Sequence, residues 1–120
     1  MYDEKYINNK LYSLSLSKFR SSFHLNKKMK EYVQVKGLDK IKSDAYELIS
    51  KRLSPAFIAN DGKQTPMRQV HPVFIAQHAC ACCCRGCLEK WYKIPKGREL
   101  TKKEEDFVVT LLLEWIKKEI

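Results

Sequence analysis

The sequence predicts a mainly α-helical single domain, and three observations lead to this prediction. The chain has 120 residues, which fits one domain of ordinary size. Apolar residues recur at helical spacing in two long segments, 38–53 and 101–120. Helix-ending residues, Gly37 and Pro55, stand beside the first of these segments. We therefore expect one compact helical domain of about four to five helices, with a long ordered loop at 54–70.

The N-terminal segment has the weakest pattern. Residues 1–10 show little periodicity, and Leu14 and Leu16 then alternate with polar residues as they would in a short strand, before the alternation breaks. We expect residues 1–17 to form an N-terminal arm and residues 18–120 to form the helical domain.

Two helices are predicted after this arm. Asn26 can cap a helix over residues 27–36, and Gly37 can end it. A single apolar stripe then marks a second helix over residues 38–53, which ends before Pro55. The next segment has two prolines and an Asn-Asp-Gly turn signal, and this composition predicts the long loop.

The central stretch, residues 71–97, is mainly helical by residue type, although Gly86 weakens the pattern. Residues 101–104 match a capping box, where the last helix should start. Apolar residues lie on most faces of that helix. It is therefore either packed on two sides or part of a homodimer interface.

Composition excludes several classes of protein. The N-terminus lacks the features of a secretory signal, and no apolar run approaches the roughly 20 residues of a membrane span. The five cysteines are odd in number and stand within residues 80–87, so they cannot staple a fold with disulfides. We expect a soluble cytoplasmic protein in which the thiols bind metal, react or pack.

The formal net charge of +9 can attract nucleic acid or another polyanion. Residues 18–52 contain ten basic and four acidic side chains, so much of the excess lies in the N-terminal half. Lysines on exposed helix faces usually serve solvation alone. Nucleic acid is therefore one expected partner among polyanions, and no membrane is expected.

The cysteine segment predicts a zinc site in a Cys/His centre at residues 71–91. Zinc takes four nitrogen or sulfur ligands, and Cys84 and Cys87 form a C-x-x-C pair whose intervening glycine allows a tight turn. Cys83 and Cys87 would instead stand one helical turn apart. His78 and His71 could complete either set. A second C-x-x-C or an H-x-x-x-H is absent, so the motif alone does not specify the ligands.

Four alternatives to a zinc-binding module remain open. The cysteines could be small buried residues of a helix. Cys84 and Cys87 could act as attacking and resolving thiols, and an iron–sulfur cluster ranks below zinc. The protein could also be a zinc-dependent hydrolase with a water on the fourth position. An anionic substrate would then meet the polar side chains Lys63, Gln64, Thr65, Arg20 and His24.

Four motifs make the sequence similar to a known family. They are NDGKQTP at 60–66, HPVFIAQHA at 71–79, CCRGCLEKW at 83–91 and IPKG at 94–97. Together they resemble DUF4186, a small bacterial family of unknown function, over most of the chain. The resemblance implies no reaction, so whether the protein is an enzyme stays open.

The resemblance does sort the candidate ligands. The family pattern has threonines where this chain has Cys80 and Cys82, which implies that these two cysteines are expendable. It has a histidine where this chain has Tyr92, which argues against a ligand there. The candidates that match the pattern are His71, His78, Cys83, Cys84 and Cys87.

Overall fold

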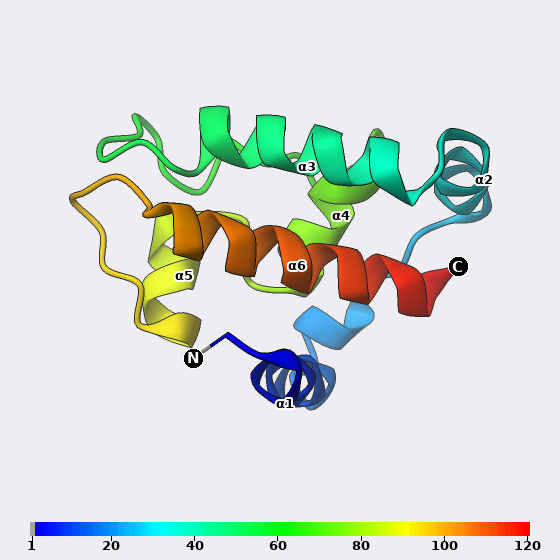
Figure 1. The fold of residues 1–120 in the computed structure, drawn as a ribbon, viewed down its shortest axis with the longest axis horizontal. Coiled ribbons are helices and arrows are strands. Elements are labelled where there is room, and N and C mark those ends of the chain that lie inside the picture. Colours follow the sequence, from blue (N-terminus) through cyan, green and yellow to red (C-terminus); the bar gives the residue numbers. More distant parts are fainter. Residues whose placement is uncertain (1) are drawn as a thin grey trace.

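The fold is built around its C-terminal helix. The computed structural model describes residues 2–120, and in these it contains six α-helices, one short 3-10 helix and no strand. The last helix, α6 (Lys102–Glu119), runs through the middle of the molecule, between α3 (Leu38–Arg52) and α1 (Glu4–Ser15) (Figure 1). The predicted mainly helical class is confirmed, with slightly more helices than expected.

The capping box predicted for α6 is present. The side chain of Thr101 accepts a hydrogen bond from the Glu104 N–H, and the Glu104 carboxylate accepts one from the Thr101 N–H. Apolar side chains on most faces of α6 are buried against α1, α3 and α4. The helix is therefore packed on several sides within one chain, and a homodimer through it stays a prediction.

The segment expected to form an N-terminal arm contains a helix that packs on the core. Residues Glu4–Ser15 form α1, which begins after Asp3, whose carboxylate accepts a hydrogen bond from the Tyr6 N–H. Ile7, Leu11 and Leu14 are buried at helical spacing against the core. Of the two residues that suggested a strand, Leu14 belongs to this stripe, whereas Leu16 is the exposed C-cap of the helix.

The two helices predicted next are confirmed. Helix α2 (Lys27–Lys36) begins after Asn26, whose side chain accepts a hydrogen bond from the Met29 N–H, and it ends at Gly37. Gly37 has a φ of 85°, which favours glycine, and the next helix, α3, follows directly. Helix α3 buries Ile41, Ala45 and Ile49 of its predicted stripe.

The central stretch is helical in two pieces. Helix α4 (Pro72–Ala79) and helix α5 (Arg85–Tyr92) are separated by a buried turn over residues 80–84. The buried side chain of Gln77 stabilises this turn by donating a hydrogen bond to the Cys82 carbonyl, 3.1 Å away. The turn leads from α4 to Cys84, the N-cap of α5, and so positions the cysteines.

The long loop expected before α4 is present between Arg52 and Pro72 and contains no helix. It lies at the same end of the molecule as α5 (Figure 1). Among the described residues, no helix is both long enough and apolar enough to cross a membrane.

The capping box of α6 predicts a measurable pH dependence of stability. Arg98 donates two hydrogen bonds of 2.8 Å to the Glu104 carboxylate, and this interaction lowers the pKa of Glu104 to about 2. Replacing Glu104 with Gln should lower the free energy of unfolding by about 1–2 kcal/mol at pH 7. Because the folded-state pKa is depressed, the stabilisation is present above about pH 4.5 and is lost as the pH falls toward 2.

Urea unfolding of both proteins between pH 7 and pH 3 measures this effect. Glu114→Gln is a matched control, since Glu114 makes a surface ion pair with Lys117 and its loss should change stability by less than about 0.5 kcal/mol. A difference between wild type and Glu104→Gln that does not shrink at low pH would contradict the assignment.

Candidate metal centre

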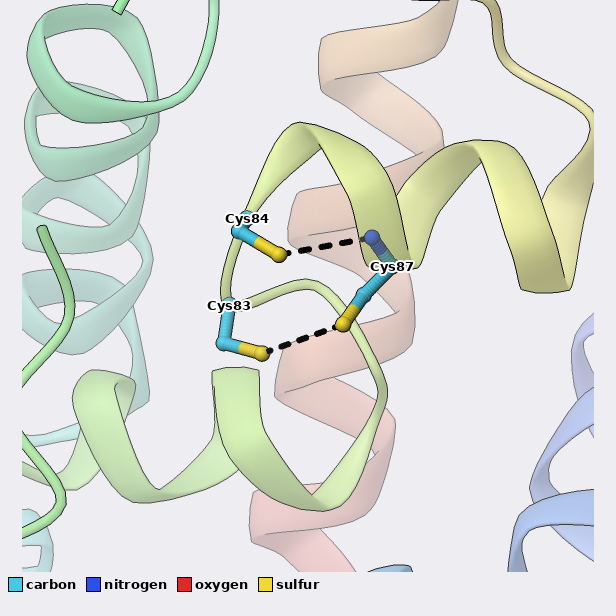
Figure 2. Close-up of side chains that lie close together, drawn as sticks. All are labelled: Cys83, Cys84 and Cys87. Carbon is cyan, nitrogen blue, oxygen red and sulfur yellow. Dashed lines mark hydrogen bonds between the residues drawn. The ribbon is translucent and has the colours of Figure 1, made fainter. Parts of the chain in front are cut away.

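Three of the five cysteines lie together at the start of α5. Cys83 is buried, whereas Cys84 and Cys87 are half-buried. Their three Sγ atoms lie within 4.8 Å of one another, and the Sγ atoms of Cys83 and Cys87 are 3.6 Å apart. Figure 2 shows the side chains of Cys83 and Cys84 pointing toward Cys87. This arrangement can hold a metal ion.

The local backbone explains how these sulfurs meet. Cys84 is the N-cap of α5, and its Sγ accepts a hydrogen bond of 3.3 Å from the Cys87 N–H. Gly86 lies in the first turn of α5 and does not have a positive φ, so the tight turn expected from glycine is a helical turn. A Cβ at Gly86 would make only ordinary contacts of 3.8–3.9 Å.

The other two cysteines belong to the core. Cys80 and Cys82 are fully buried, and the Cys82 thiol donates to the Cys80 carbonyl at 3.4 Å. Burial raises the pKa of both thiols, so they stay protonated at neutral pH. They pack as small apolar residues.

A buried arginine contacts two of the three clustered sulfurs. Arg20, in the 3-10 helix η1 (Arg20–Ser22), donates hydrogen bonds to the Sγ atoms of Cys87 at 3.2 Å and Cys83 at 3.6 Å, and to the His78 carbonyl at 2.8 Å. Within residues 2–120 it has no carboxylate partner. Its positive charge is therefore placed to stabilise negative charge on sulfur.

The thiol pKa values respond to this geometry. The hydrogen bond with Cys87, together with Arg20 and against the effect of burial, lowers the pKa of Cys83 to about 7. The thiolate of Cys83 and burial raise the pKa of Cys87. Burial also raises the pKa of Cys84. Of the three clustered thiols, Cys83 is therefore the one that the geometry favours as a thiolate.

The two candidate histidines lie outside this group of sulfurs. The Nε2 atom of His78 is 2.9 Å from the Thr65 carbonyl and must carry the proton, because a carbonyl only accepts. His71 is the N-cap of α4: its Nδ1 accepts from the Val73 N–H, and its Nε2 is 3.2 Å from Asp44. As a metal ligand, His71 would have to give up one of these bonds.

Comparison with known families gives one match, which covers most of the chain. Residues 8–117 match the family described as Domain of unknown function (DUF4186). The chain belongs to the DUF4186 family. No solved structure matches it.

The predicted anion-binding side chains of this DUF4186 domain do not all meet in one site. The Thr65 hydroxyl is buried and donates to the Cys83 carbonyl, whereas Gln64 hydrogen-bonds to Asp61. His24 is exposed and pairs with Glu119 at 3.0 Å. Lys63 is exposed beside Gln64, and Arg20 faces the sulfurs.

Two further residues of the DUF4186 domain support the site and were missed from the sequence. Asp61 accepts hydrogen bonds from the N–H groups of Arg85 at 3.0 Å and Gly86 at 3.2 Å, so the loop caps α5. Buried Arg85 donates in turn to the carbonyls of Leu53, Ser54, Pro55 and Pro95. The turn motif around Asp61 was the only signal available for the first contact.

Removing the Asp61 cap should loosen the start of α5. Against the effect of burial, hydrogen bonds from Gln64 and from the two N–H groups of α5 lower the pKa of Asp61, so the carboxylate is ionised at pH 7. Asp61→Ala should lower the free energy of unfolding by about 1 kcal/mol.

Hydrogen exchange should show the loss of protection at the amides of Arg85 and Gly86. Glu31→Ala is the control, because Glu31 is exposed on α2 and makes no ion pair within the described chain. Unchanged exchange at both amides in Asp61→Ala would refute the capping role.

Proposed function

We propose that this domain binds one zinc ion through Cys83, Cys84 and Cys87. The observation that carries the proposal is the convergence of the three Sγ atoms within 4.8 Å. Zinc–sulfur bonds of about 2.3 Å in a tetrahedron place neighbouring sulfurs about 3.8 Å apart. The 3.6 Å separation of Cys83 and Cys87 is close to that value, so coordination requires only small side-chain rotations.

Charge supports the same assignment. Three thiolates around a divalent ion carry a net charge of −1, which the guanidinium of Arg20 would neutralise. Its hydrogen bonds to the sulfurs of Cys83 and Cys87 would also orient these two ligands toward the metal. Such compensation matters here because Arg20 and Cys83 are buried.

Three sulfurs leave a fourth position for another ligand, such as water. A zinc site of this kind could be structural, holding the start of α5 to the turn at 80–84, or it could activate a water for hydrolysis. An iron–sulfur cluster is less suitable, since it needs about four cysteines. Because all five thiols are free, we place the protein in a reducing compartment, the cytoplasm.

Metal analysis tests the proposal. Protein made in zinc-supplemented medium and purified without an affinity tag should contain about one zinc per chain by elemental analysis and native mass spectrometry. Changing Cys83, Cys84 or Cys87 to Ser should each lower that content to less than about a fifth, because each removes one of only three sulfur ligands. The controls Cys80→Ala and Cys82→Ala should keep the zinc. Wild-type protein that contains well under one equivalent of zinc per chain would refute the proposal.

Thiol–disulfide exchange is a second candidate, favoured by the 3.6 Å contact between Cys83 and Cys87. The Cys83 thiolate would attack a disulfide substrate, forming a mixed disulfide and releasing one thiolate. Cys87, losing its proton, would then attack Cys83 Sγ, giving the Cys83–Cys87 disulfide and releasing the second thiolate.

Equilibration of the metal-free protein in glutathione buffers separates the two candidates. A redox protein should form the Cys83–Cys87 disulfide reversibly, with a reduction potential near that of the cytosolic glutathione pool, because only then can it exchange with that pool. Mass spectrometry after alkylation measures the oxidised fraction. A pair that stays reduced, or that forms only mixtures with Cys84, would exclude this role.

A further inference from the structure

An open pocket of about 430 Å³ lies at the end of α3, and the proposed metal site does not use it. Its walls come from the last turn of α3 and from the loop that follows, on both sides of the turn at residues 60–62. The side chains that matter for its chemistry are Lys51, Arg52, Phe57, Lys63 and Gln64. Its volume is in the range of small-ligand pockets.

Three cations and no acid line this pocket. Lys51 reaches Glu47 only at 3.6 Å, and both side chains are about 70% exposed, so their ion pair is weak. Lys63 has no ion-pair partner within residues 2–120. The pocket therefore has a positive potential that favours an anionic ligand.

The walls of the pocket are held in place by contacts to other parts of the chain. Buried Arg85 donates to the carbonyls of residues 53–55, directly before Phe57. Asp61 is fixed on the start of α5, and Arg52 donates to the Gln64 carbonyl at 3.0 Å. The loop is thus anchored on each side of the residues that face the pocket, and ordering it on binding costs little.

The aromatic ring of Phe57 is 83% exposed at this pocket. It is the most exposed of the large apolar side chains among the described residues. An exposed ring on an anchored loop offers a flat surface on which a planar base can stack. Nucleotide recognition combines two elements, which are cations that bind the phosphate and an aromatic ring on which the base stacks.

We propose that this pocket binds a nucleotide, with its phosphate between Lys51, Arg52 and Lys63 and its base on Phe57. The same chemistry is offered by a free mononucleotide and by one unit of a single-stranded nucleic acid. The pocket is a separate site from the proposed zinc centre, because no clustered cysteine lines it.

Binding measurements on the 120-residue chain, as purified, test the proposal with two probes. One is AMP, followed by calorimetry, and the other is a fluorescein-labelled ten-base oligothymidylate, followed by anisotropy. Lys63→Ala and Phe57→Ala should each raise the Kd of a bound probe about fivefold to tenfold, and Phe57→Trp should preserve binding because the ring remains. These side chains are exposed, so the variants should fold normally.

Lys5→Ala is the matched control, since it removes the same charge from the exposed surface of α1, on the opposite side of α6 from α3 (Figure 1). It should change either Kd less than twofold.

Phe57-dependent binding of AMP identifies a free nucleotide as a ligand, and the same dependence with the oligonucleotide alone identifies a single strand. The proposal is overturned if neither probe binds with a Kd below about 1 mM. It is also overturned if Phe57→Ala leaves both Kd values unchanged, or if Lys5→Ala weakens binding as much as Lys63→Ala.

Discussion

The arrangement around the cysteines depends on the hydrogen bonds that the buried guanidinium of Arg20 donates. A charge buried without compensation would destabilise the fold by several kcal/mol. Arg20 receives that compensation from the sulfurs of Cys83 and Cys87 and from one carbonyl. These contacts place a positive charge beside the two sulfurs and so favour negative charge on them.

A second buried arginine connects this centre to the loop. Arg85 also has no carboxylate partner in the described chain. Its guanidinium instead donates hydrogen bonds to carbonyls at the C-terminal end of α3, where the helix dipole is negative. Asp61 makes the reverse contact, from the loop to the positive start of α5. The loop and the cysteine centre therefore form one connected unit, which explains how so long a loop stays ordered.

Sequence reasoning succeeded where the signals are local. Asn26, Gly37 and Thr101 mark helix ends by their own side-chain or backbone chemistry, and each one functions as predicted. Helix α1 was missed because its stripe of three buried residues is short and overlaps a strand-like alternation. Only the packing of this segment against α6 distinguishes a helix from a strand here. That contact joins opposite ends of the sequence, so no local pattern reveals it.

In the candidate site, too, the local contacts could be predicted from the sequence and the long-range contacts could not. The closeness of Cys83, Cys84 and Cys87 follows from their spacing in the sequence, which the C-x-x-C pattern shows directly. The partner Arg20 is separated from Cys87 by 67 positions, and no periodicity links them. Cys84 is a weak N-cap for α5. Cysteine is not among the preferred helix N-caps, and a neutral thiol accepts hydrogen bonds weakly. Helix α5 tolerates this weak cap because Asp61 supplies a carboxylate from the loop, and this leaves the sulfur of Cys84 available for other chemistry.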